Sequence, residues 1–102
     1  MIYETLLQEF LKHPRDIHTI PLTKKECKWF YVFTNNGSLY VEPAHDHIPK
    51  SAVKRRRLND AECDKMLELH YKRLAGQTVS KEAQETTYSQ VYWYGIFSEL
   101  NL

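Results

Sequence analysis

The chain has 102 residues, with 14 Lys and Arg against 13 Asp and Glu, and a formal net charge of +1. Hydrophobic residues make up 42% of it, which excludes a disordered chain, and the length suits one domain with one small core. No apolar run approaches the roughly 18–20 residues that span a bilayer. The first ten residues include Glu4 and Glu9, unlike a signal peptide. We therefore expect a single cytosolic domain, residues 1–102, with no membrane partner.

Positive charge is concentrated in the first part of the chain. Residues 1–57 contain ten Lys and Arg and six Asp and Glu, a balance of +4. Residues 58–102 contain four and seven, a balance of −3. The basic part ends in four consecutive cations, Lys54–Arg57. Such a run is typical of a nucleic-acid contact, although it is equally typical of a solvated segment in front of a helix.

The first element expected in chain order is an amphipathic helix in IYETLLQEFLKH, which Pro14 ends. A polar loop follows, and then CKWFYVFTNNGSLYVEP predicts a β-hairpin, because Asn36-Gly37 suits a type I′ turn. That turn pairs Phe33 with Tyr40 and Val32 with Val41. One face of the hairpin is then formed by Phe30, Val32, Leu39 and Val41, and the other by Trp29, Tyr31, Phe33 and Tyr40.

The second half of the chain predicts helices. Asn59 and Glu62 resemble a capping box, and Gly76 is placed to end a helix over Asn59–Ala75. The stretch from Ser80 onward favours helix, broken near Thr87–Ser89, although TTYSQVYWYGIF is also rich in β-formers. The residues expected to pack inward there are Tyr88, Val91, Tyr92, Ile96 and Phe97. Gly95 inside this stretch indicates close backbone packing or a kink.

These elements define an α+β domain. It comprises an N-terminal helix, an antiparallel hairpin with either two strands or a third near Ser51–Arg57, and two or three C-terminal helices. The basic residues 1–57 contain the helix and the hairpin, and the acidic residues 58–102 are helical. Cys27 and Cys63 have no C-x-x-C spacing and are expected to be small buried hydrophobes.

The order of parts after Leu58 resembles the helix-turn-helix of bacterial regulators and of the DNA-binding domains of site-specific recombinases. In that resemblance Ala83 lies where the first short helix packs, Thr87–Ser89 form the turn, and a recognition helix begins at Gln90. The run Lys54–Arg57 resembles the basic arm that enters the adjacent minor groove. No Lys or Arg lies between Thr86 and Leu102, so phosphate contacts would depend on that run.

Catalytic and metal-binding motifs give no comparable signal. His45 and His47, with Glu42 nearby, are ligand types for zinc, but a third ligand has to come from elsewhere in the chain. A polar loop that contains two histidines is therefore the preferred interpretation, and a metal-dependent enzyme ranks third among the functions. Neither a nucleophile motif nor a phosphate-binding glycine loop is present. We expect no catalytic residue, no metal and no cofactor.

Two functions remain. The first is a small non-enzymatic nucleic-acid-binding or regulatory protein, with DNA favoured over RNA. Its contacts would be Lys54, Arg55, Arg56, Arg57, Lys50, Arg73, Gln90 and Tyr92. The alternative is a protein-interaction module or homodimer with an exposed aromatic surface, formed by Trp29, Tyr31, Tyr92, Trp93 and Tyr94. Composition does not separate the two, because aromatics and Arg are enriched in both kinds of interface.

Overall fold

The computed structural model describes residues 2–21, 26–87 and 89–102 and confirms the α+β class. The helices and strands follow in the order α1 (Ile2–Lys12), β1 (Arg15–His18), β2 (Trp29–Asn35), β3 (Ser38–Pro43), β4 (Arg56–Leu58), α2 (Asp60–Leu74), α3 (Ser80–Thr86) and α4 (Gln90–Glu99). Within the described ranges, no helix combines the length and the apolar character needed to cross a membrane.

The sheet has four antiparallel strands in the order β1-β2-β3-β4. The predicted register of the hairpin is confirmed, with Phe33 opposite Tyr40 and Val32 opposite Val41. Asn36 and Gly37 have φ angles of 50° and 76°, as a type I′ turn requires. Strand β1 was not predicted, since RDIH contains only one apolar residue, and it forms because it pairs with β2 along its whole length.

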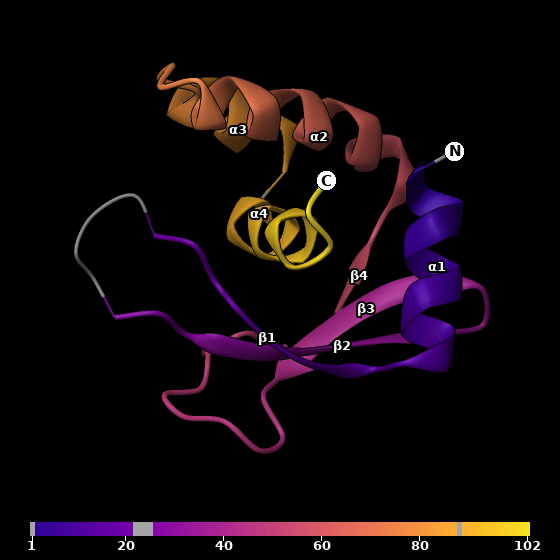
Figure 1. Ribbon diagram of the computed structural model, residues 1–102. Coiled ribbons are helices and arrows are strands. Elements are labelled where there is room, and N and C mark those ends of the chain that lie inside the picture. Colours follow the sequence, from indigo (N-terminus) through magenta and orange to yellow (C-terminus); the bar gives the residue numbers. More distant parts are fainter. Residues whose placement is uncertain (1, 22–25, 88) are drawn as a thin grey trace.

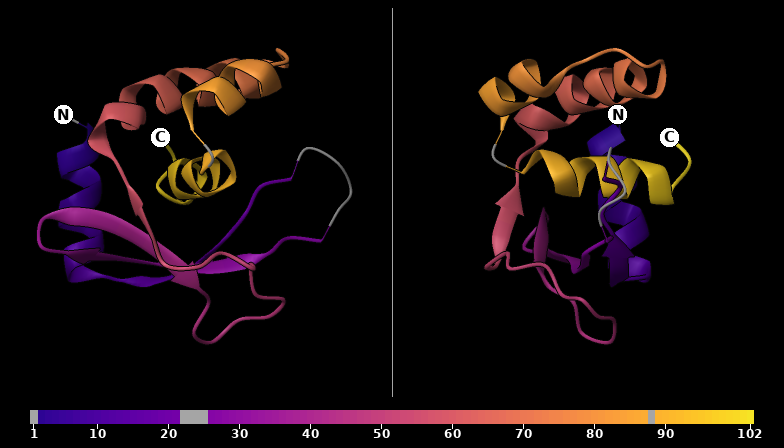
Figure 2. Two further views of the ribbon diagram at one scale, coloured as in Figure 1. Left: turned by 180° about the vertical axis from the view of Figure 1, so that it is seen from behind. Right: turned by 90° about the vertical axis from the view of Figure 1, so that its left-hand side faces the viewer.

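Helices α2, α3 and α4 lie over one face of the sheet, which we call the inner face (Figure 1). Its four residues, Phe30, Val32, Leu39 and Val41, have no exposed surface. Helix α4 lies between this face and the pair α2–α3, and both views in Figure 2 show the same layering (Figures 1 and 2). Helix α1 packs beside these layers, and its Tyr3 hydroxyl donates a hydrogen bond to the Leu58 carbonyl at the end of β4, at 2.6 Å.

Helix α4 is the central element, and the predicted break at residues 87–89 is confirmed. Residues 93–97 are all buried, and a Cβ at Gly95 would lie 2.8 Å from the carbonyl oxygen of His18. Gly95 therefore permits the close approach of α4 to β1, which is the first of the two alternatives that the sequence left open. Ile96 and Phe97 pack inward, whereas Val91 is 45% exposed, so its predicted burial was wrong. Tyr88 lies outside the described residues.

The C-terminal end of α2 was predicted correctly, but the capping of its N-terminal end was not. Asn59 is the N-cap residue but makes no side-chain capping hydrogen bond, so the predicted capping box is wrong. Its Oδ1 instead accepts from Arg57, while the Glu62 carboxylate accepts from Trp93 Nε1 at 3.2 Å. At the other end Gly76 has a φ of 87°, and the amides of residues 76 and 77 close a Schellman motif as expected.

Both cysteines are free thiols, but only one is a core residue. Cys63 is completely buried, and burial raises the pKa of its thiol to about 12. Cys27 is only half-buried, so the expectation of a small buried hydrophobe holds for Cys63 alone.

Candidate functional site

The four consecutive cations do not form one patch, because strand geometry separates them. Successive side chains of a strand point to opposite faces, and β4 begins within the run. Arg55 reaches the outer face of the sheet, where it pairs with Glu42 Oε1 at 3.1 Å and lies over the Phe33 ring. Arg56 donates to Ser89 Oγ, and Arg57 donates to Asn59 Oδ1. The four side chains therefore do not lie together on one face of the sheet.

Two residues of the run contribute instead to a groove beside β2 and β4. It has a volume of about 610 Å³, and its cationic lining residues are Lys28, Lys50, Lys54 and Arg56. All four side chains are exposed, and the lining residues of this groove include no acidic side chain within the described part of the chain. We call it the basic groove. Its charge and concave shape suit a polyanion.

Backbone hydrogen bonds between distant segments build this groove. The amide of Trp29 donates to the Pro49 carbonyl at 2.8 Å, and the amide of Ser51 donates to the Trp29 carbonyl at 2.7 Å. These bonds bring Lys50 beside the start of β2, next to Lys28. Lys28 was not predicted, since in the sequence it is an isolated lysine far from the basic run.

Tyr92 lines the basic groove and is held in place by two contacts. Its hydroxyl lies 2.9 Å from Ser51 Oγ, and its ring meets the Phe30 ring edge-on with 5.0 Å between centroids. Tyr92 lies in the first turn of α4 and is the residue of that helix that lines the groove. Because Tyr92 is already held in place, a ligand that binds there does not have to order its side chain, which would cost free energy.

The predicted nucleic-acid residues thus fall into two groups. Lys50, Lys54, Arg56 and Tyr92 meet in the basic groove. The other four do not: Arg55 and Arg57 make the contacts given above, and Arg73 and Gln90 line a neighbouring pocket.

The predicted aromatic surface is also divided. Trp93 has no exposed surface and Tyr94 is 4% exposed, so neither contributes to an exposed aromatic surface for a protein partner. Trp29 and Tyr31 alternate with the inward-facing Phe30 and therefore lie on the outer face, away from Tyr92. The five residues do not form one surface. Helix α4 is apolar on most sides because it is the middle layer of the fold.

The outer face of the sheet is covered by a short loop rather than by a helix. His47 stacks on the Trp29 ring with 4.0 Å between centroids, and His45 stacks on the Tyr31 ring at 3.5 Å. We call residues 44–48 the histidine loop. Trp29 and Tyr31 remain half-buried beneath it.

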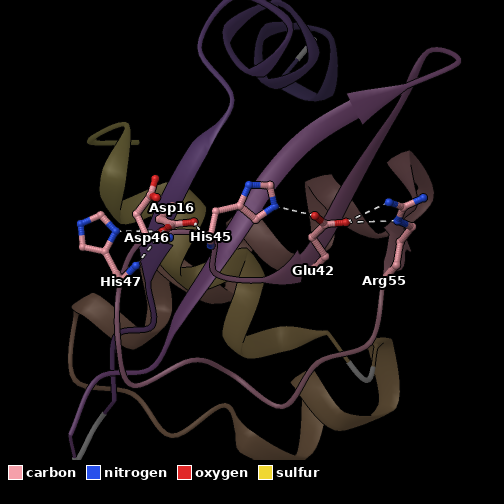
Figure 3. Close-up of polar contacts among 6 residues, drawn as sticks. All are labelled: Asp16, Glu42, His45, Asp46, His47 and Arg55. Carbon is pink, nitrogen blue, oxygen red and sulfur yellow. Dashed lines mark hydrogen bonds and ion pairs between the residues drawn. The ribbon is translucent and has the colours of Figure 1, made fainter.

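Two carboxylates hold the histidine loop in place (Figure 3). Asp16 accepts hydrogen bonds from the amides of His45, Asp46 and His47 at 2.8–3.1 Å and from His47 Nδ1 at 2.9 Å. Glu42 accepts from His45 Nε2 at 2.6 Å and from Arg55. Asp46, although acidic and adjacent, has an exposed side chain.

These contacts lower the pKa of both carboxyl groups. Burial alone would raise the pKa of Asp16, but the hydrogen bonds from the histidine loop outweigh it. For Glu42 the hydrogen bond from His45 is the largest cause, desolvation opposes it, and Arg55 lowers the pKa further. Each imidazole is therefore engaged with a carboxylate. Within the described ranges, no three His, Cys, Asp or Glu side chains are grouped so as to hold a metal ion.

Helices α3 and α4 follow one another across residues 87–89, in the order that the helix-turn-helix resemblance implies. Ala83 is buried, and so are residues 93–97 of α4, which leaves the first turn of that helix and its last two residues, Ser98 and Glu99, as its accessible parts. No family model, curated protein or solved structure matches the chain. A functional proposal therefore depends on the geometry of the chain itself.

Proposed function

We propose that the chain is a small, non-enzymatic, cytosolic nucleic-acid-binding protein that contacts phosphates through the basic groove. One observation supports this most: four exposed cations from two separate segments, Lys28 and the stretch 50–56, line one concavity, whose described lining includes no acidic residue. The formal net charge of the whole chain is only +1, so this concentration of positive charge is local. A local field of one sign attracts a polyanion even when the total charge is small.

The number of cations sets the expected salt dependence. If Lys28, Lys50, Lys54 and Arg56 each neutralise one phosphate, log Kobs falls with log salt with a slope of about −3.6 on duplex DNA, since each contact contributes about −0.9. Phosphate contacts of this kind position a nucleic acid without reading its sequence. The proposal therefore predicts strongly salt-dependent binding with weak sequence preference, and it retains the preference for DNA over RNA.

Fluorescence anisotropy with labelled duplex DNA, single-stranded DNA and RNA over a salt series tests this proposal. The variant for comparison changes Lys28, Lys50 and Lys54 to Ala. These lysines are exposed, and none forms an ion pair with another described residue, so the fold should persist. We expect the affinity for duplex DNA at low salt to fall by at least tenfold and the slope to approach about −1.

A matched variant changes Lys12, Lys65 and Lys81 to Ala. It removes the same charge from residues outside the groove. Comparable losses in both variants would indicate attraction to the overall charge and would contradict a specific groove. An absence of binding by the wild-type protein at low salt would end the nucleic-acid proposal.

The protein-interaction function is retained as a second candidate, with a smaller surface than predicted. The outer face of the sheet has four half-buried aromatic residues, Trp29, Tyr31, Phe33 and Tyr40, on the side away from α2, α3 and α4 (Figure 1). Association through this face, including formation of a homodimer, would respond little to salt. Sedimentation over a range of protein concentrations at low and high salt would detect it.

A further inference from the structure

A second pocket lies next to the basic groove, on the side of α3 and α4. Its volume is about 670 Å³, which falls in the range of small-molecule sites. The end of α2, helix α3, the first turn of α4 and the segment after β1 surround it, and Figure 1 shows that segment leaving the sheet on the side of α4. Lys28 and Ser51 line both this pocket and the basic groove.

The pocket offers an apolar surface with a few polar groups. Ile20, Pro21, Val79 and Val91 line it together with Tyr94. Val91 is 45% exposed, an unusual position for an apolar residue that begins a mostly buried helix. Gln84 and Gln90 are among its polar lining residues. An apolar lining with a small number of polar groups is the usual composition of a site for an organic ligand.

Arg73 is the fixed cation of this pocket. Its Nη2 donates to the Ile20 carbonyl at 2.7 Å, and its guanidinium lies 4.2 Å from the centroid of the Tyr94 ring. These two contacts hold the guanidinium plane in one orientation. One face of it is covered by the aromatic ring, and burial lowers the pKa of Arg73 because its charge is poorly solvated.

That charge has no acidic partner. Across residues 2–21, 26–87 and 89–102, Arg73 forms no ion pair with a carboxylate, although most of the other arginines do or donate to a side chain. Glu26 also lines the pocket, but among the described residues no ion pair joins it to Arg73. A half-buried cation without a counterion is costly, and an anion that reaches it gains a charge-assisted hydrogen bond.

The hydroxyl group of Tyr94 also lacks a hydrogen-bond partner among the described residues. The Tyr94 side chain is 4% exposed, and this hydroxyl is buried. A buried hydroxyl in this state costs free energy unless a partner completes it. Arg73, which has no acidic partner among the described residues, therefore lies against a tyrosine whose hydroxyl lacks a hydrogen-bond partner.

We propose that this pocket binds a small organic anion, with a carboxylate or sulfonate on Arg73 and an apolar body against Ile20 and Val91. The cation that anchors the ligand here differs from those of the proposed nucleic-acid contact, since Arg73 does not line the basic groove, although Lys28 and Ser51 line both. The ligand class follows from the unpaired guanidinium and from the apolar lining. A fully polar anion would leave that lining uncovered, and a neutral apolar molecule would leave Arg73 unpaired.

Two fluorescent probes with nearly the same body test the proposal. Anilinonaphthalene sulfonate has the anion, and phenyl naphthylamine lacks it. We expect the folded wild-type protein to bind the sulfonate at least tenfold more tightly, since a hydrogen bond to a charged group contributes about 1.5 kcal/mol or more. Amide chemical shifts of residues in α3 and the first turn of α4 should change on binding.

Two variants locate the anion. Arg73→Gln removes the charge, and we expect it to lower the sulfonate affinity about tenfold while the affinity for the neutral probe stays the same. Val91→Glu places a negative charge at an exposed lining position and should lower the affinity for the sulfonate probe alone. This variant therefore tests the site even if the Arg73→Gln protein does not fold. Leu11→Glu is the matched control, because Leu11 is 72% exposed and lies outside the pocket.

Equal affinity of the wild-type protein for the two probes would overturn the proposal, as would unchanged sulfonate binding in both variants. The changes Lys50→Ala and Lys54→Ala, made together, separate this site from the basic groove, because neither lysine lines the pocket. That double variant should bind the sulfonate normally while its affinity for DNA falls. Loss of both activities would contradict the assignment of different anchoring cations to the two sites.

Discussion

The two faces of the sheet are stabilised in different ways. The inner face is covered by helices, and its four apolar residues are completely buried. The outer face is covered by the histidine loop, which two carboxylates hold through hydrogen bonds. Packing depends on volume and responds little to pH, whereas carboxylate hydrogen bonds depend on ionisation. Strand β2 therefore contributes to both surfaces. Its residues Phe30 and Val32 belong to the core, which responds little to pH, and the alternate residues Trp29 and Tyr31 lie under the histidine loop, whose stability depends on pH.

The largest expected effect is on the inner face. Phe30→Ala should lower the free energy of unfolding by about 4 kcal/mol, because it leaves a cavity beneath α4. Phe33→Ala on the outer face should cost less than about 2 kcal/mol, since Phe33 is only half-buried. Urea denaturation of both variants gives the comparison. Similar losses would show that the two faces do not differ in the way described.

The next effect concerns the histidine loop. The Asp16 side chain is 2% exposed and accepts from three amides and one imidazole, so Asp16→Asn should cost about 3 kcal/mol at neutral pH. Its folded-state pKa lies below the ordinary 3.8, so its contribution is complete above that value and is lost as pH falls through the folded-state pKa. The difference between wild type and variant should therefore shrink in acid.

Asp46→Asn is the matched control for that change. The residue is adjacent to the same loop positions, but its side chain is exposed, so the cost should stay below about 0.5 kcal/mol. Chemical denaturation at several pH values checks both variants. A pH-independent loss in Asp16→Asn would contradict stabilisation by the ionised carboxylate.

A smaller loss tests the contact between α4 and the inner face. The Cβ of Gly95→Ala would lie 2.8 Å from the His18 carbonyl oxygen and 3.1 Å from the Phe30 ring. Backbone must shift to accept it, so we expect a loss of about 2 kcal/mol despite the better helix propensity of Ala. Thermal unfolding measures it. An increase in stability would mean that α4 lies farther from β1 than described.

The smallest expected effect is a gain. Tyr94→Phe removes a buried hydroxyl without a described partner and should raise the free energy of unfolding by about 1 kcal/mol. Tyr92→Phe removes a hydroxyl that is bonded to Ser51 and should lower it by about the same amount. Opposite signs in the two variants would confirm the difference between the hydroxyl groups, and a loss in both would contradict it.

Local rules were enough to predict the hairpin. Asn36-Gly37 fixes the turn, the turn fixes the register, and alternation then assigns Phe30 and Val32 to the inner face. The same rule, applied to Lys54–Arg57, would have shown that a strand divides the run. The burial of Trp93 and Tyr94 could also have been expected, because a helix that is apolar on most sides lies inside a protein.

The basic groove and the pocket could not be predicted in this way. Lys28 and Lys50 become neighbours through backbone bonds at Trp29, and Arg73 meets Ile20 and Tyr94 only after α2, α4 and the segment after β1 have packed. Such contacts depend on tertiary structure, and the residues involved are scattered and individually unremarkable in the sequence. Isolated lysines and arginines are usually solvated, so nothing local distinguishes these from the others.

The segment between β3 and β4 has a consequence for protein engineering. Its first half forms the histidine loop on the Trp29 ring, and its second half pairs with the Trp29 backbone and supplies Lys50 to the basic groove. Both surfaces thus depend on one continuous stretch, which contacts the ring of Trp29 with one half and its backbone with the other. An insertion, a deletion or a loop graft between Ala44 and Ser51 would change both of them together, so neither surface can be transplanted or redesigned as a separate module.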